Sequence, residues 1–230
     1  FLHGAMVDGT RVMSPLDFSA KSGRPLPRSF PKSFQADVLN LTGQPVTELP
    51  AGLRAYELIL ANTPLTTLPP DLQVESRLDL SGCDELESLP EGLTVGSLVL
   101  RGCTNFKLLP ERLDVWFLDL TGCWAFEHWP QVASIRTGHL QLRGCTALRE
   151  LPSYLGALSA LNVRDCPNLT RLPSDLKMTG WLELAHSGLT TRDALPPGLA
   201  RQLHERGTLP PGLRDYVRDY FSSLDPKRTR

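Results

Sequence analysis

The stretch LDLSGCDELESLPEGL, from Leu78 to Leu93, decides the fold of this chain. It begins with a leucine pair around one variable residue, continues with Gly-Cys, and ends with Leu-Pro and a further leucine. The stretch from Leu98 to Leu113, LVLRGCTNFKLLPERL, repeats this order twenty residues later. Recurrence at such a short period predicts a stack of similar turns, because no single unit can bury its apolar side alone.

All five cysteines fall in the same register of this repeat. Each comes three residues after an apolar-x-apolar triplet and three residues before another large apolar residue: Cys83, Cys103, Cys123, Cys145 and Cys166. Four of them follow a glycine, which permits a tight turn. The pattern predicts cysteine side chains that point inward, where the S–H group can donate to a loop carbonyl of a neighbouring turn. Gln44, Thr63 and Ser187 occupy the same position in units near the two ends.

The triplet predicts a short strand with its two apolar residues inward and the middle residue outward. Stacked units would form a parallel sheet with strands roughly 4.8 Å apart. A proline closes most units and excludes a regular helix there, so we expect an extended, turn-like convex side. The unit with Trp129-Pro130 is longer, which predicts a local irregularity between Val132 and Gly138.

The unit Leu-x-Leu-x-Gly-Cys-x-x-Leu-x-x-Leu-Pro-x-x-Leu resembles the repeats of leucine-rich repeat proteins. Its short length and its Leu-Pro-x-x-Leu half resemble the bacterial type found in invasion-plasmid-antigen-type effectors. The cysteine differs from the asparagine common in that type and resembles plant and animal intracellular repeats. The resemblance implies an α/β solenoid: a horseshoe with a parallel concave sheet and a turn-like convex side.

Three regions are expected along the chain. Residues 1–36 would form an N-terminal cap with a degenerate repeat at Leu16-x-Phe18, and residues 37–195 about eight repeats. Residues 196–230 would form a C-terminal cap with a short amphipathic helix between Leu213 and Leu224, where apolar residues recur at helical spacing.

Composition narrows the class of partner. The 230 residues carry a net charge of −1, so there is no basic excess to engage nucleic acid. No apolar run approaches about 18 residues, and no signal segment is visible, so we expect no membrane association. An odd number of inward cysteines favours free thiols, a reducing compartment and a cytoplasmic protein, in the host cytosol if it is a secreted effector. Alternating disulfides and zinc are the disfavoured alternatives.

No motif for nucleotide binding, hydrolysis or metal catalysis occurs in the chain. Cys166 beside Asp165 suggests a nucleophile, but its register favours a buried ladder thiol. We therefore expect a non-enzymatic monomer with no cofactor and no metal.

The outward positions of the strands supply the candidate site. They place an arginine row beside an acidic row and add aromatic residues, the composition of interface hot spots. Alternatively, alternating charges only keep an exposed sheet soluble. The candidate partner-binding residues are Asp79, Arg101, Phe117, Asp119, His139, Gln141, Arg143, Asn162, Arg164, Trp181 and Glu183.

These observations predict protein–protein recognition through the concave face, as the part of an effector that selects a substrate or a host target. The alternative is the recognition part of a ubiquitin ligase whose catalytic domain lies outside this chain. A purely structural array with no specific partner is a third possibility.

Overall fold

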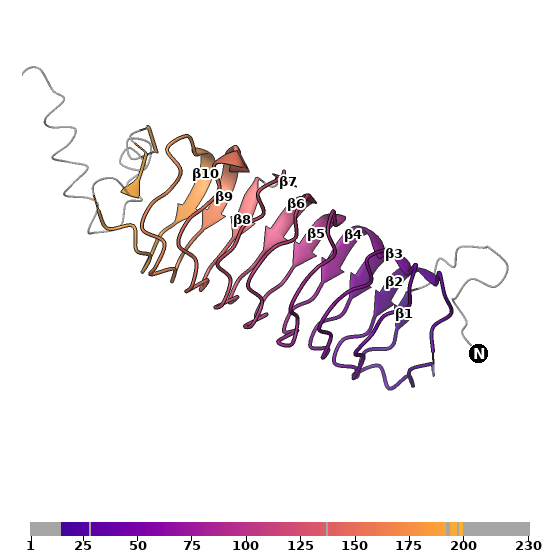
Figure 1. Cartoon of the computed structure of the whole chain (residues 1–230). Coiled ribbons are helices and arrows are strands. Elements are labelled where there is room, and N and C mark those ends of the chain that lie inside the picture. Colours follow the sequence, from indigo (N-terminus) through magenta and orange to yellow (C-terminus); the bar gives the residue numbers. More distant parts are fainter. Residues whose placement is uncertain (1–14, 28, 137, 192–193, 197, 200–230) are drawn as a thin grey trace, which may run out of the picture.

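The computed structural model describes residues 15–199, apart from residues 28, 137, 192–193 and 197. Its described part is a parallel-strand solenoid, with the strands stacked along one side and the loops along the other (Figure 1). One sheet contains the strands in the order β1-β2-β3-β4-β5-β6-β8-β9-β10, and β7 pairs beside β6. Their bounds are β1 Leu16–Asp17, β2 Gln35–Asn40, β3 Arg54–Ile59, β4 Gln73–Asp79, β5 Thr94–Val99, β6 Leu113–Asp119, β7 Ala133–Ile135, β8 His139–Gln141, β9 Ala157–Asn162 and β10 Lys177–Glu183.

The strands pair in the register that the repeat predicts. The first leucine of each triplet lies beside the first leucine of the next, so that one leucine column runs through the array: Leu39, Leu58, Leu78, Leu98, Leu118, Leu140, Leu161 and Leu182. Because a shift by one residue would turn the leucines toward solvent, burial of this column fixes the register.

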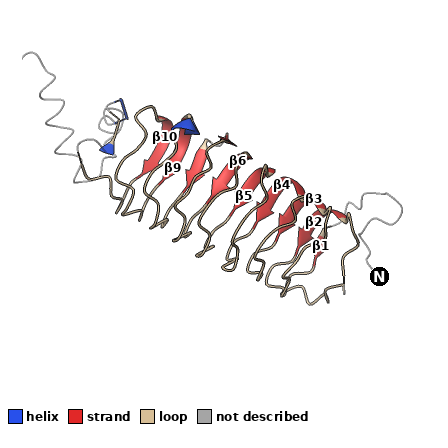
Figure 2. Cartoon of the chain, viewed as in Figure 1, coloured by secondary structure: helices blue, strands red, loops and turns tan. Residues whose placement is uncertain are grey.

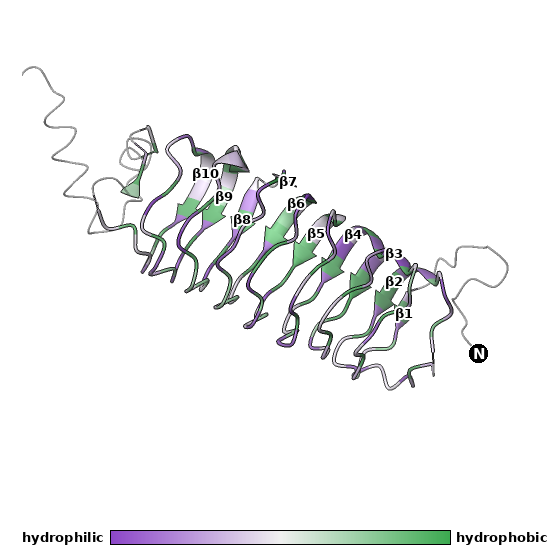
Figure 3. Ribbon diagram, viewed as in Figure 1, coloured by the Kyte–Doolittle hydropathy of each residue, from purple (hydrophilic) through white to green (hydrophobic). Residues whose placement is uncertain are grey.

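A continuous apolar core fills the space between the sheet and the loops. Figure 3 shows hydrophobic residues recurring along the stacked strands. The triplet leucines are buried, and so are the apolar residues that follow the cysteines. Phe106 and Phe126 stack with parallel rings, whose centroids are 6.5 Å apart. Each turn therefore buries its apolar side against its neighbours, as expected for a solenoid.

The convex side consists mainly of turns and extended segments (Figure 2). A short 3-10 helix, η1 (Ser153–Leu155), interrupts it after Pro152. The prediction of a turn-like convex side is thus confirmed, and strands predominate over helices in the α/β solenoid. The helix predicted between Leu213 and Leu224 lies outside the described residues.

The turn after Pro130 is irregular, as its length predicts. Its strand is divided into β7 and β8, and β6 pairs with both of them. Ala133 in β7 lies beside Leu113, whereas Leu140 in β8 lies beside Leu118. The extra residues are thus accommodated between two short strands while the leucine column continues.

The five cysteines form a ladder on the inner side of the solenoid. Each is fully buried and free, and its Sγ lies 2.9–3.2 Å from a leucine carbonyl oxygen of the preceding turn. The pairs are Cys83 with Leu60, Cys103 with Leu80, Cys123 with Leu100, Cys145 with Leu120, and Cys166 with Leu142. The predicted inward orientation and carbonyl contact are confirmed.

Other side chains take the cysteine position near the ends of the array. Gln44 donates from Nε2 to the carbonyl oxygen of Phe18 in the preceding turn, at 2.7 Å. Thr63 and Ser187 instead donate to carbonyls of their own turns, those of Leu60 and Leu184. Buried loop carbonyls therefore keep donors where the cysteine is absent.

Candidate functional site

The outward side of the sheet, here called the concave face, is wider than the alternating triplet suggests. In β5, Val95 and Leu98 are both buried, and the two residues between them are more exposed. Val115 and Leu118 repeat this arrangement in β6. Each long strand therefore contributes two adjacent positions to the concave face before the triplet begins.

The middle positions of the central triplets are buried, which corrects the expectation that they point into solvent. Asp79, Val99 and Asp119 are buried, and Asp119 has an exposed fraction of 0%. Asn162, Gln141 and Glu183 are only half-buried. The middle positions thus form the floor of the concave face, and the flanking positions rise above it.

A local hydrogen bond explains why acidic and amide residues occupy this floor. The side-chain oxygen accepts a hydrogen bond from the backbone N–H two residues later, where the strand turns into the loop. This bond measures 2.9–3.1 Å in six turns, with the acceptors Asp17, Asn40, Asp79, Asp119, Asn162 and Glu183. Four of the predicted site residues therefore have a structural role at the ends of their strands.

Two carboxylates of the floor are also covered by arginines. Arg101 Nε donates to Asp119 Oδ2 at 2.5 Å, and Arg77 donates to Asp79 Oδ2 at 2.6 Å. Burial acts to raise the pKa of Asp79, but hydrogen bonds from Ser81 and Arg77 outweigh it and hold that pKa below its ordinary value. Over β4, β5 and β6, the predicted acidic and basic rows are therefore joined into ion pairs.

At the C-terminal half of the concave face, Asp165 lies close to Arg143 and Arg164, the other two arginines of the predicted row. The sequence did not predict this role for Asp165. Its Oδ2 lies 3.4 Å from Arg143 Nε and 3.5 Å from Arg164 Nε, and its Oδ1 lies 2.9 Å from His186 Nδ1. The hydrogen bonds with His186 and Arg143, together with the charge of Arg164, hold the pKa of Asp165 below its ordinary value. Asp165 occupies the place of the turn glycines and has a φ of 58°, so the register of the glycines could have identified it.

Of the two aromatic residues predicted on the concave face, Trp181 is exposed and Phe117 is not. Phe117 is half-buried, whereas its neighbour Trp116 is 62% exposed. The two inward residues Val115 and Leu118 push Trp116 outward, and their spacing in the sequence is the signal that was missed. Trp181 is 49% exposed, as expected, and Tyr56 in β3 is a further exposed ring.

The C-terminal half of the face brings several predicted residues together. His139, Ala160 and Trp181 lie side by side in the sheet register, so His139 and Trp181 flank a small residue. His139 is exposed. In the next row, Asn162 Nδ2 donates to Gln141 Oε1 at 3.2 Å. Together with Arg143 and Arg164, these side chains form one polar and aromatic surface over β8, β9 and β10.

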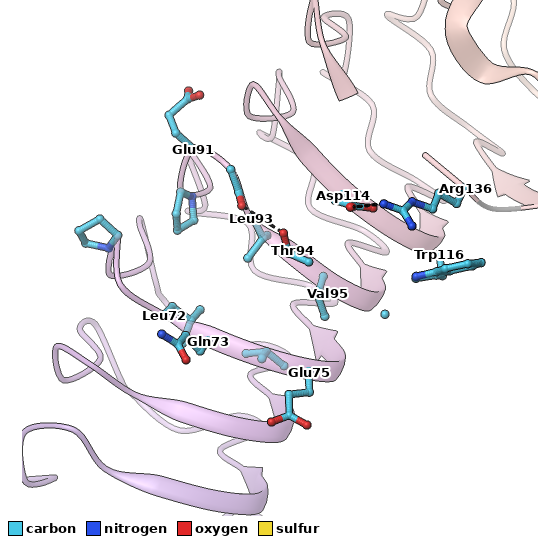
Figure 4. Close-up of a pocket in the computed structure, with 15 residues that line it drawn as sticks. Leu72, Gln73, Glu75, Glu91, Leu93, Thr94, Val95, Asp114, Trp116 and Arg136 are labelled. Carbon is cyan, nitrogen blue, oxygen red and sulfur yellow. Dashed lines mark hydrogen bonds and ion pairs between the residues drawn. The ribbon is translucent and has the colours of Figure 1, made fainter. Parts of the chain in front are cut away.

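An open groove of about 610 Å³ lies over the beginnings of β4, β5 and β6, away from that surface (Figure 4). Its lining includes Glu75, Gly96, Asp114, Trp116 and Arg136. Arg136 donates to Asp114 at 2.7 Å, and its guanidinium carbon lies 5.4 Å from the centre of a Trp116 ring. None of these five residues was predicted as a site residue.

Within the described residues, no group of three or more histidine, cysteine or acidic side chains is placed to hold a metal ion. Burial raises the pKa of the Cys123 thiol to about 12 and that of Cys166 to about 11. Protonated, buried thiols are poor nucleophiles. The structure thus supports the prediction that Cys166 is a ladder residue. In the same part of the chain, no helix has the length and apolar character needed to span a bilayer.

A family model and a solved structure each match part of this chain. A family model described as a domain of unknown function (DUF8809) matches residues 199–226. No curated protein matches this sequence. A solved structure, the leucine-rich repeat domain of the type III effector XopL, is 24% identical over 64% of this chain and 69% of that chain, with a TM-score of 0.38. The assignment of this chain to the short leucine-rich repeat fold rests on its own strand register and cysteine ladder.

Proposed function

We propose that this leucine-rich repeat array is a recognition module that binds a protein partner across its concave face. A solenoid of this kind offers an extended sheet face as its natural binding surface. The binding surface would be the part over β8, β9 and β10, where His139, Arg143, Arg164 and Trp181 lie.

The observation that carries the proposal is the composition of that surface. Trp181 is half exposed within β10, and Arg143 and Arg164 keep 54% and 41% of their side chains accessible. Aromatic and arginine side chains dominate the binding energy of protein interfaces, because they bury much area and form several hydrogen bonds. The alternative, that the charges only keep the exposed sheet soluble, does not account for an exposed tryptophan at Trp181.

Asp165 gives this surface a defined geometry before a partner binds. It holds Arg143, Arg164 and His186 close to one carboxylate. Side chains that are already ordered lose less conformational entropy on binding. A partner carboxylate could therefore approach two arginines whose positions are set in advance.

The sequence resemblance to repeats of bacterial effectors extends the proposal to the source of the partner, a protein of a host cell. Under this extension the array selects the target, and any chemistry would belong to another protein or another part of a longer chain. The ubiquitin-ligase alternative and the absence of enzymatic activity stay predictions.

The test compares two charge-reversal variants of equal charge. Arg143→Glu with Arg164→Glu changes the concave face, whereas Arg149→Glu with Arg171→Glu changes exposed arginines outside the candidate surface. A partner captured from cell extract should bind the concave variant at least about tenfold more weakly and the control variant as the parent protein does. Equal binding to both variants, with unchanged melting temperatures, would show that this surface is not the binding site.

A further inference from the structure

The groove over β4, β5 and β6 exists because one concave position carries no side chain. Gly96 lies in β5, between Glu75 in β4 and Trp116 in β6. A Cβ at Gly96 would lie only 2.7 Å from the carbonyl oxygen of Ser76, so a larger residue would force the backbone apart. The gap is therefore part of the packing of these strands. The walls of the groove, Glu75 in β4 and Trp116 in β6, lie two strand spacings apart, which is roughly 9.6 Å. This distance leaves room for one flat side chain.

The charge of the groove favours a cationic occupant. Its lining contains three carboxylates, Glu75, Glu91 and Asp114, and one guanidinium, that of Arg136, which gives a formal charge of −2. Asp114 already pairs with Arg136 at 2.7 Å. Glu75 and Glu91 are exposed and form no ion pair with any other described residue. Their carboxylates remain available to a partner.

Trp116 shows which cation fits. Arg136 lies against its ring on the β7 side, with its guanidinium carbon 5.4 Å from the ring centre, while the indole stays 62% exposed. Figure 4 shows the Arg136 side chain extending toward Asp114 above Trp116, with Glu75 on the opposite side of the groove. A second guanidinium could lie against the exposed part of the indole and still reach the Glu75 carboxylate.

We infer that the gap at Gly96 is a subsite for an arginine side chain of the protein partner, with Trp116 as its apolar wall and Glu75 as its counter-ion. Arginine fits better than lysine because its planar group stacks on an indole and pairs with a carboxylate through two donors. The inference deepens the proposed concave-face recognition and rests on it. It places a second contact at the N-terminal half of the same face.

The experiment titrates the whole 230-residue protein, labelled with ¹⁵N, with the peptide acetyl-Ala-Ala-Arg-Ala-Ala-amide. The matched peptide contains citrulline, which keeps the shape of arginine without its charge, and a third peptide contains lysine. The indole N–H signal of Trp116, assigned from Trp116→Ala, reports binding in the groove. The test variants are Glu75→Gln and Trp116→Ala, and the latter is followed through backbone signals of β5. The matched controls are Glu85→Gln and Trp124→Ala, because both residues are exposed and lie outside the groove.

The arginine peptide should shift the Trp116 signal and bind at least about fivefold more tightly than the citrulline and lysine peptides. Each test variant should weaken it by about two- to fivefold, the size expected for one exposed ion pair or one cation–π contact. The controls should bind as the parent protein does. Equal binding of arginine and citrulline peptides, or equal effects of test and control variants, would overturn the inference.

The outcome also separates this inference from the proposed function. If the Arg143→Glu with Arg164→Glu variant loses the protein partner while no arginine peptide enters the groove, the inference fails and the concave-face proposal stands. If the arginine peptide binds as described but the partner ignores every concave variant, the proposed function fails instead.

Discussion

Arg101 donates from Nε to the carboxylate of Asp119 at 2.5 Å, although the aspartate is completely buried and the arginine side chain is 62% exposed. The other carboxylate oxygen of Asp119 accepts the N–H of Thr121 at 2.9 Å. The two residues lie on adjacent turns, so the pair ties one turn to the next and completes the hydrogen bonds at the end of β6. Asp119 therefore holds Arg101 and the end of β6 in place beneath the surface of the concave face. The exposed side chain of Arg101 is accessible to a partner.

Replacing Asp119 should separate its two roles. Asp119→Ala removes the acceptor of the Thr121 N–H and should lower the free energy of unfolding by about 2–3 kcal/mol, chiefly through an unpaired backbone donor. Asp119→Asn keeps an oxygen for Thr121 but turns its amide NH2 group toward the Arg101 donor, which can move into solvent because its side chain is 62% exposed. It should therefore cost less than the alanine variant, about 1 kcal/mol. Urea unfolding of both variants measures the difference, and equal losses would contradict the role assigned to the backbone hydrogen bond.

Cys123 should tolerate serine better than alanine. The thiol is fully buried and donates to Leu100 O at 2.9 Å, and that oxygen also accepts the N–H of Cys103 at 3.1 Å. Cys123→Ala should cost about 1–3 kcal/mol, because it removes one donor and leaves a small void. Cys123→Ser keeps a donor and should cost less. Chemical denaturation gives both values, and a more stable alanine variant would argue against the ladder hydrogen bond.

The cysteines should be unreactive in the folded protein. All five are buried, and burial raises their thiol pKa values, most clearly for Cys103 and Cys145. A chromogenic disulfide reagent at pH 8 should therefore modify five thiols rapidly in denaturant and none of them rapidly in the native state. Rapid modification of several native thiols would contradict the inward register of the middle turns.

Stability should fall in alkaline solution. Cys123 and Cys166 have pKa values of about 12 and about 11 in the folded protein, against an ordinary value of 9.0. Well below pH 9 the thiols are protonated in both states. Above it the unfolded chain loses protons that the folded chain keeps, so the unfolded state gains stability as the pH rises.

Urea unfolding at several pH values between 8 and about 10.5 tests this dependence. The double variant Cys123→Ser with Cys166→Ser is the control, because serine does not titrate there while the tyrosines and lysines are unchanged. The parent protein should lose stability more steeply with pH than the variant. Parallel pH profiles would show that these two thiols do not contribute.

The repeat predicts the fold because its information is local. The leucine triplet fixes which residues point inward, the proline excludes a convex helix, and the cysteine marks the turn. Even the division of the strand near Ala133 follows from the extra length of one unit. These features depend on residues a few positions apart, so a single sequence contains them.

The concave face was predicted less completely because its side chains depend on neighbouring turns. Asp119 is buried because Arg101, 18 residues earlier in the chain, covers it. Trp116 is exposed because Val115 and Leu118 both point inward, which places two residues between them on the outer side. The gap beside it depends on Gly96 in the preceding strand. Alternation within one triplet describes none of these cross-strand relations.

The most direct test of concave-face recognition is site-specific photocrosslinking to the captured partner. A benzophenone amino acid replaces Thr179, which is exposed in β10 near Trp181, or Glu87, which is exposed after the turn at Leu86. Concave-face recognition predicts a crosslinked partner band at Thr179 and none at Glu87, with melting temperatures equal to that of the parent protein. A crosslink at Glu87 without one at Thr179 would contradict the proposed binding face.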